Sequence, residues 1–152
     1  IHVNTNSNIL RIIYNIMHKD KNGNFIGIGE DSTFEILKEM YPNKEIKRQV
    51  KLTSLLSQDW IDDLGEIQRK ETLDLVIYDD PIIVVRVQDK HHTGAITAAR
   101  DVIQKATLEW NDCIVVDLFH YECKNLMKER VNSDSRREIL LAFRSEGVVP
   151  NL

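Results

Sequence analysis

The sequence predicts a single domain of the α/β class, and three observations support this prediction. Residues 72–90 contain two apolar segments of strand length joined by an Asp-Asp-Pro turn, which is the pattern of a hairpin. Segments with helical spacing of apolar residues lie on both sides of this hairpin. Residues 113–119 form a continuous apolar run that is typical of a buried strand. A chain of 152 residues is long enough for one domain with a substantial core.

The N-terminal part contains two expected helices. Over residues 7–18, apolar side chains recur at helical spacing, which predicts an amphipathic helix. Residues 25–29 have the character of a short strand. Ser32 and Glu35 match a capping box, so the second helix is expected to begin there and to end at Pro42.

The middle of the chain alternates between strand and helix patterns. Residues 48–52 alternate like a half-buried strand, whereas residues 54–71 are polar and aperiodic and are expected to form a loop with at most a helical turn. A helix is expected after Gly94, with polar residues on the side away from a wide apolar stripe. The stripe consists of Ala95, Ile96, Ala98, Ala99, Val102, Ile103, Ala106 and Leu108.

The expected elements divide the domain into a core and two helical additions. The core covers residues 28–119, residues 1–24 form an N-terminal helical extension, and residues 120–152 form C-terminal helices. One C-terminal helix is expected near residues 123–130, and a last one over residues 135–147, where a glycine ends it. The sequence contains no repeat, low-complexity tract or interdomain linker.

The amino-acid composition indicates which cellular environment and which binding partners to expect for this protein. With 42% hydrophobic and 29% charged residues, the sequence is that of an ordinary globular protein, and no apolar run approaches the roughly 20 residues of a membrane helix. No membrane partner and no secretory leader are expected. Cys113 and Cys123 have neither zinc-ligand nor disulfide-framework spacing, so they are interpreted as reduced thiols of a cytoplasmic protein. The net charge of −4 weakens a nucleic-acid hypothesis, although local basic patches can still bind a phosphate backbone.

The hairpin brings polar side chains of its two strands together. Because side chains alternate along a strand, Gln88 and Lys90 share one side with Arg86. Pairing across the turn places the start of the first strand beside the end of the second, so Asp74 meets Gln88 and Lys90. A carboxylate, an amide oxygen and a main-chain carbonyl suit Mg²⁺, and an ammonium group can assist an attacking water. The sequence therefore predicts a site for Mg²⁺, with Mn²⁺ as an alternative.

The order of elements, with an acid on the second strand and a polar-x-Lys triplet on the third, resembles the PD-(D/E)xK, or restriction-endonuclease-like, nucleases. Within them it is most similar to the branch related to very-short-patch-repair endonucleases. The resemblance covers residues 28–119 and implies an αβββαβ core with a mixed sheet flanked by helices. The matching pieces are Glu30 or Asp31, Val50-Lys51-Leu52, Asp74-Leu75-Val76, the segment of residues 86–92, and Arg100-Asp101 with Lys105.

The third strand departs from the family pattern. If it is aligned to Glu-x-Asp, Arg86 and Gln88 replace both acids; if it is aligned to Glu-x-Lys, only Gln88 replaces an acid. We favour the second alignment, because an amide oxygen can bind a metal ion and Arg86 cannot. One lost charge should still weaken cation binding. In this alignment the resemblance implies metal ligation by Asp74, Gln88, the main-chain carbonyl of Asp89 and Glu30, with Lys90 completing the catalytic set.

Two functions are compatible with these residues. The first is a Mg²⁺-dependent deoxyribonuclease that hydrolyses a phosphodiester with a metal-activated water. The second is a catalytically inactive domain of the same architecture that binds DNA or a protein partner. A homodimer, or a protein partner bound through flanking domains, is compatible with both. The residues expected to contact DNA are Lys47, Arg48, Lys51, Arg69, Lys70, His92, Gln104 and Lys105.

The same residues also have purely structural interpretations. An acid within an apolar run that is buried on both faces needs a partner, which favours a functional role for Asp74. Asp101 and Lys105 lie one helical turn apart, so a surface ion pair accounts for both. Gln104 is expected to be solvated. The polar residues at the end of the second strand are also compatible with simple fraying.

Overall fold

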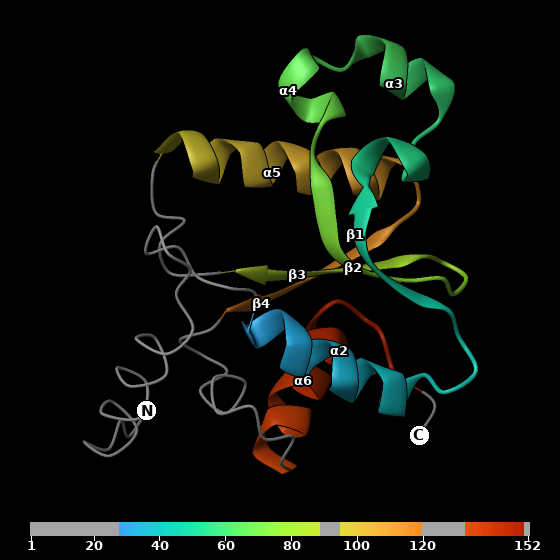
Figure 1. The fold of residues 1–152 in the computed structure, drawn as a ribbon, viewed down its shortest axis with the longest axis vertical. Coiled ribbons are helices and arrows are strands. Elements are labelled where there is room, and N and C mark those ends of the chain that lie inside the picture. Colours follow the sequence, from blue (N-terminus) through green and yellow to red (C-terminus); the bar gives the residue numbers. More distant parts are fainter. Residues whose placement is uncertain (1–27, 89–94, 120–132, 151–152) are drawn as a thin grey trace.

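The computed structural model describes residues 28–88, 95–119 and 133–150, which form a four-stranded sheet with helices on both faces (Figure 1). The predicted α/β class is therefore confirmed. In chain order the elements are α2 (Ile28–Met40), β1 (Ile46–Lys51), the 3₁₀ helix η1 (Leu52–Leu55), α3 (Gln58–Asp63), α4 (Glu66–Arg69), β2 (Thr72–Ile77), β3 (Ile83–Gln88), α5 (Ala95–Trp110), β4 (Ile114–Phe119) and α6 (Ser133–Ser145).

The sheet is mixed, with the strand order β1-β2-β3-β4. Strands β1, β2 and β3 pair antiparallel in sequence, and the predicted hairpin is β2 and β3. Strand β4 lies parallel to β3, with Arg86 opposite Asp117. Parallel neighbours need a long crossover, and helix α5 belongs to this connection. Helix α5 is thereby placed over the strands that carry the polar residues.

Helices α2 and α6 cover one face of the sheet with apolar side chains. Ile36 and Leu37 of α2 and Ile139 and Phe143 of α6 are fully buried in one cluster with side chains of β2, β3 and β4. Helix α6 ends at the predicted glycine: Gly147 has a φ of 76°, and the N–H groups of the two residues after Glu146 donate to carbonyls of the last turn. This face is an ordinary apolar layer.

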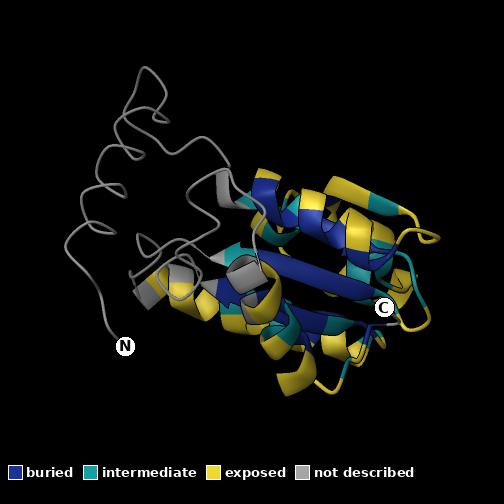
Figure 2. Ribbon diagram, turned by 90° about the horizontal axis from the view of Figure 1, so that it is seen from below, coloured by how far each residue is buried: buried dark blue, intermediate teal, exposed yellow. Residues whose placement is uncertain are grey.

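Helix α5 covers the opposite face in a different way. Its Leu108 is buried with Val76, Val84 and Val115 in a second apolar cluster. Most of the predicted apolar stripe is nevertheless exposed. Figure 2 colours the fold by burial and shows the strands of the sheet as mostly buried. The large exposed side chains of α5 are Ile96 (71% exposed), Val102 (68%), Ile103 (48%) and Trp110 (75%).

The start of α2 differs from the prediction. The helix begins at Ile28, so the expected strand over residues 25–29 is wrong at its last two positions. The expected capping box is also wrong, because Ser32 and Glu35 lie inside the helix, where Glu35 forms an ion pair with Lys38 (Nζ–Oε1 3.1 Å). Two acids earlier in the chain occupy the first turn, where negative charge stabilises the helix dipole.

The segment of residues 54–71 is also more ordered than expected. It contains the end of η1 and the short helices α3 and α4, which lie beyond the end of the β1–β2 pair (Figure 1). Leu52 is buried at the start of η1, and Gly65 provides the N-cap of α4. Short helices of one or two turns have no room for a full apolar period, which explains why the pattern was aperiodic.

Several predictions lie outside the described residues. They are the helices over residues 7–18 and 123–130 and the site residues Asp89, Lys90 and His92. Gln88 belongs to β3, but only its backbone is described. Within the described ranges, no helix combines the length and the apolar character needed to cross a membrane.

Candidate functional site

The ladder between β2 and β3 ends where the first polar residues occur. The strands pair from Ile77 and Ile83 to Leu75 and Val85. One residue further, the same register sets Asp74 across from Arg86. There the Asp74 carboxylate takes over the role of a main-chain acceptor, because the N–H of Val87 donates to Asp74 Oδ2 at 2.9 Å. One carboxylate oxygen of Asp74, the candidate metal ligand, thus forms a hydrogen bond that joins β2 to β3.

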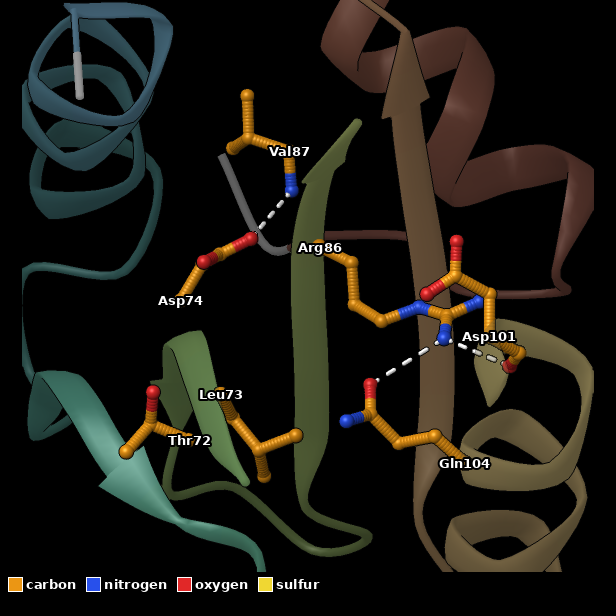
Figure 3. Close-up of a pocket in the computed structure, with 7 residues that line it drawn as sticks. All are labelled: Thr72, Leu73, Asp74, Arg86, Val87, Asp101 and Gln104. Carbon is orange, nitrogen blue, oxygen red and sulfur yellow. Dashed lines mark hydrogen bonds between the residues drawn. The ribbon is translucent and has the colours of Figure 1, made fainter. Parts of the chain in front are cut away.

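A polar pocket of about 180 Å³ opens at this point, between the ends of the paired strands and helix α5 (Figure 3). The half-buried Asp74 forms part of one wall, and Arg86 lies on the other side. The lining residues are Thr72, Leu73, Asp74, Arg86, Val87, Asp101 and Gln104. Asp74 was predicted to belong to the site, and the structure places it in this pocket.

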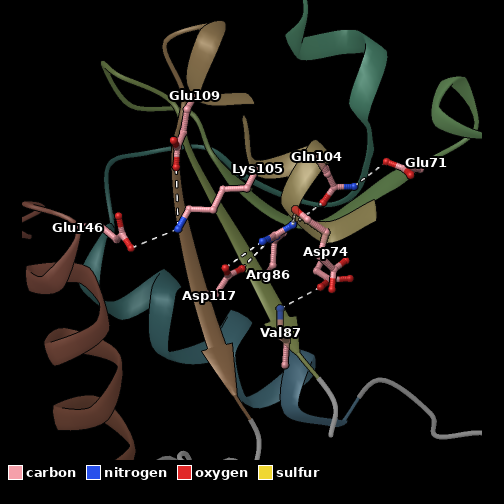
Figure 4. Close-up of polar contacts among 10 residues, drawn as sticks. Glu71, Asp74, Arg86, Val87, Gln104, Lys105, Glu109, Asp117 and Glu146 are labelled. Atoms are coloured by element: carbon pink, nitrogen blue, oxygen red, sulfur yellow. Dashed lines mark hydrogen bonds and ion pairs between the residues drawn. The ribbon is translucent and has the colours of Figure 1, made fainter. Parts of the chain in front are cut away.

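Arg86 is the most constrained side chain of the pocket, with only 6% of its surface exposed. Its Nε and Nη2 donate to the two carboxylate oxygens of Asp117, at 2.6 and 2.9 Å. Its Nη1 donates to the main-chain carbonyl of Asp101 at 2.8 Å and to Gln104 Oε1 at 3.2 Å (Figure 4). Such a bidentate, charge-assisted pair fixes the guanidinium in orientation as well as in place.

Gln104, in the interior of α5, extends this network to Glu71. Its Oε1 accepts from Arg86, and its Nε2 donates to Glu71 Oε2 at 2.9 Å. An amide can serve a cation and a carboxylate at once because it carries both an acceptor and donors. The prediction that Gln104 is solvated is wrong: the side chain is half-buried and bonded on both ends.

Glu30, which the resemblance implies as a metal ligand, faces strand β1. Its Oε1 accepts from Gln49 Nε2 at 3.0 Å and from Arg48 at 3.3 Å. Gln49 has a φ of 52°, and its Oε1 accepts from Thr72 Oγ1 at 3.1 Å. Glu30 is therefore connected to the rim of the pocket through Gln49 and Thr72, but it does not belong to the lining of the pocket.

Several basic residues expected to contact DNA already interact within the protein. Lys51 and Lys70 are exposed on the surface. Lys105 contacts Glu109 (3.9 Å) and Glu146 (3.7 Å), so the expected pair with Asp101 is not the contact that it makes (Figure 4). The other interactions are Lys47 with Glu45, Arg48 with Glu30 and Asp31, and Arg69 with the carbonyls of Leu64 and Asp62.

The described side chains do not fit a divalent cation. No group of three or more His, Cys, Asp or Glu side chains within residues 28–88, 95–119 and 133–150 is arranged to hold a metal ion. The fixed guanidinium of Arg86 also places a positive charge across the pocket from Asp74. This guanidinium repels a cation bound to Asp74, although its ion pair with Asp117 offsets part of the repulsion.

Two members of the network, Asp117 and Glu71, were not predicted from the sequence. Asp117 was part of the apolar run over residues 113–119, and the signal was available: an acid in a buried strand needs a partner. The parallel register of β3 and β4 supplies that partner as Arg86. Glu71 lay in the segment expected to be a loop, and no local pattern indicated a tertiary contact there.

No protein-family model matches the sequence, and neither a curated protein nor a solved structure matches it. The functional assignment therefore depends on the sequence resemblance and on the geometry of the pocket.

Proposed function

We propose that this chain is a catalytically inactive domain of restriction-endonuclease-like architecture that acts through binding. The observation that carries this proposal is the position of Arg86, which lies across from Asp74. In the Glu-x-Asp alignment of the third strand, the family has an acid at the position of Arg86. The observed order of helices and strands agrees with the αβββαβ core that the resemblance implies. On this basis the domain keeps the architecture of a nuclease, but its described side chains do not form a metal-ligand cluster.

The charge of the pocket supports binding without hydrolysis. Catalysis by a bound Mg²⁺ requires oxygen ligands with a net negative charge around the ion. Here Asp74 supports the backbone of Val87, and Asp117 neutralises Arg86. The described ligands would therefore have to give up existing interactions before they could bind a metal ion.

A protein partner agrees better with the described surface than DNA does. Most of the candidate phosphate contacts are paired with carboxylates or carbonyls, and the protein has a net charge of −4. Helix α5, in contrast, presents an apolar stripe to solvent. Contiguous exposed apolar surface of this kind is characteristic of an interaction site. The α5 stripe consists of Ile96, Ala99, Ile103, Ala106 and Trp110.

The partner that we propose for the α5 stripe is a second copy of this chain. The stripe alternates spacings of three and four residues, as in helices that pack side by side. It also alternates large and small side chains. In an antiparallel pair with Ala99 opposite Ile103 of the second copy, Ile96 lies opposite Ala106, so each isoleucine packs against an alanine. The stripe is thus complementary to itself, as a two-fold interface requires.

Light scattering during size-exclusion chromatography tests this partner. The wild-type protein should have twice its chain mass of 17.7 kDa at high concentration and should dissociate on dilution. Ile103→Lys should be monomeric, whereas Leu141→Lys, a control at an equally exposed apolar position of α6, should remain dimeric. A wild-type monomer at every concentration, or a dimer that survives Ile103→Lys, would reject the α5 stripe as the interface.

A Mg²⁺-dependent deoxyribonuclease is the second candidate function. It is favoured by one observation: Asp74 lines an open polar pocket at the position where the resemblance expects a catalytic acid. Incubation of purified protein with plasmid, duplex and single-stranded DNA in Mg²⁺ or Mn²⁺ separates the two candidates. We expect no cleavage. Metal-dependent cleavage that is lost in Asp74→Ala, and retained in a matched surface variant such as Asp59→Ala, would establish the nuclease instead.

A further inference from the structure

The two tryptophans of the chain lie side by side where α5 ends. Trp60 of α3 and Trp110 of α5 have ring centroids 6.5 Å apart, with the ring planes inclined at 37°. A hydrogen bond fixes the start of α3 at the same place, because the N–H of Ser57 donates to Asn111 Oδ1 at 3.1 Å. Trp60 is half-buried, whereas Trp110 is 75% exposed. The half-buried ring therefore supports an exposed aromatic surface.

A hollow of about 310 Å³ lies against this exposed ring and is negatively charged. The lining residues are Ala106, Glu109, Trp110 and Asp112. The side chains of Glu109 and Asp112 are both exposed. Lys105 contacts Glu109 at 3.9 Å and Glu146 at 3.7 Å, so one lysine is shared by two acids and neutralises Glu109 only in part. The hollow thus combines an indole ring with two carboxylates.

Helix α3 extends the negative charge beyond the hollow. Its sequence is Gln-Asp-Trp-Ile-Asp-Asp, with three acids and no basic residue. Asp59, Asp62 and Asp63, which flank Trp60 in the sequence, are all exposed. Such a surface attracts a positively charged partner, and it attracts a partner with several cationic side chains most strongly.

We infer that the hollow beside Trp110 binds an arginine side chain of a basic peptide segment in a partner protein. A guanidinium group is planar, so it stacks on an aromatic ring and at the same time donates hydrogen bonds to carboxylates. It therefore matches Trp110 together with Glu109 and Asp112. The acids of α3 attract further basic residues of the same segment.

This site lies beyond the paired residues of the proposed dimer. In the proposed register, the pair of Ile96 with Ala106 is the last one before Trp110, which follows one helical turn later. Trp60 and the acids of α3 do not belong to the α5 stripe. The inference therefore adds a second interaction surface and does not depend on the dimer.

Tryptophan fluorescence tests the inference directly, because the chain has no tryptophan outside this pair. The wild-type protein is titrated with the acetylated and amidated peptide Gly-Arg-Gly-Arg-Gly, and with the same peptide in which citrulline replaces arginine. Citrulline keeps the shape of arginine but carries no charge. The arginine peptide should change the fluorescence in a saturable way and bind about tenfold more tightly than the citrulline peptide. Added NaCl should weaken the binding of the arginine peptide.

The double variant Glu109→Gln/Asp112→Asn tests the carboxylates. It should bind the arginine peptide about fivefold more weakly and the citrulline peptide as well as wild type does. Asp112 has a φ of 64°, which asparagine also adopts, so the backbone should not change. The control Glu35→Gln/Glu39→Gln removes two charges on α2, across the sheet from α5, and should bind both peptides like wild type.

Trp110→Leu provides a second test that does not use tryptophan fluorescence. Fluorescence anisotropy of a fluorescein-labelled arginine peptide should show binding to wild type and a loss of most of the affinity in Trp110→Leu, because the guanidinium loses its aromatic surface. Arginine and citrulline peptides that bind equally well would overturn the inference. So would unchanged affinity in Trp110→Leu, or equal weakening in the α2 control, which would mean that only the net charge of the protein matters.

The outcomes for the inference and for the proposed function are distinguishable. DNA cleavage by the wild-type protein would reject the inactive function, and a monomer at every concentration would reject the α5 stripe as the interface. Equal binding of the arginine and citrulline peptides would reject only the arginine site.

Discussion

The two faces of the sheet show how differently one chain uses amphipathic helices. On one face, α2 and α6 bury their apolar residues against the strands, and Phe143 and Ile139 are fully inaccessible. On the other face, α5 turns Gln104 and the carbonyl of Asp101 towards Arg86 and leaves much of its apolar stripe exposed. The first face contributes stability, and the second carries the polar network and the proposed interface.

The strands account for this difference. Towards α2 and α6, the side chains of β2 and β3 are aliphatic, so an apolar helix surface packs best there. Towards α5, Arg86 and Asp117 interrupt the apolar surface, and a buried charge pair needs polar neighbours to complete its hydrogen bonds. Near Arg86, the hydrogen bonds that Arg86 makes to α5 therefore set the orientation of the helix, and the burial of its apolar stripe does not.

The largest effect is expected for Phe143→Ala on α6. Removing a fully buried aromatic side chain should lower the free energy of unfolding by about 3–5 kcal/mol. Leu141→Ala on the same helix, where the side chain is 54% exposed, should change it by less than about 0.5 kcal/mol. Urea denaturation of both variants measures this contrast. Equal effects would mean that α6 does not pack as described.

The next largest effect is expected for Asp117→Ala. It should lower the free energy of unfolding by about 3 kcal/mol, because it leaves the buried Arg86 without its carboxylate partner. Replacing both charged residues, as in Arg86→Met with Asp117→Leu, should lower the free energy of unfolding much less, since apolar side chains need no counter-charge when they are buried. A double-mutant cycle by urea denaturation measures the coupling. Independent, additive effects would show that the two side chains do not interact as a pair.

A smaller effect of opposite sign is expected at Tyr41, which belongs to the α2 and α6 face. Its hydroxyl is buried and has no hydrogen-bond partner among the described residues, so Tyr41→Phe should raise stability by about 1 kcal/mol. Burial, and secondarily the charge of Asp79, raise the pKa of Tyr41 to about 12.

The same tyrosine gives a test at alkaline pH. Because the folded state keeps its proton more tightly, the stability of the wild type should be retained below about pH 10 and lost as pH rises towards 12. Tyr41→Phe should lose less stability than wild type over this range. Identical pH profiles in guanidinium denaturation would contradict the buried position of the hydroxyl.

The smallest effect on folding is expected for Ile103→Ala on α5. The side chain is 48% exposed, so the free energy of unfolding of the monomer should change by less than about 0.5 kcal/mol. Leu108→Ala, on the buried side of the same helix, is the matched control and should cost about 2–4 kcal/mol. A large loss in Ile103→Ala at concentrations where the protein is monomeric would place this side chain inside the domain.

The sequence was sufficient to predict the hairpin, the buried strand β4, helix α5 and the glycine that ends α6, because each has a strong local pattern. Asp74 was predicted as a metal ligand beside Gln88 and Lys90. The structure places it in a polar pocket, where its carboxylate accepts from the N–H of Val87, and its metal-binding role stays a prediction. The orientation of α5 and the pairing of Arg86 with Asp117 were not predicted. Both depend on the parallel register of β3 and β4, which joins residues 31 positions apart and has no local signature.

The most direct test is a crystal structure of the wild-type protein grown with an excess of MnCl₂, with anomalous scattering data collected for manganese. We predict that Arg86 remains bidentate on Asp117 and that no anomalous peak lies within bonding distance of Asp74 or Asp117. A manganese ion bound to Asp74, with Arg86 displaced from Asp117, would contradict the inactive site and would restore the metal-dependent nuclease.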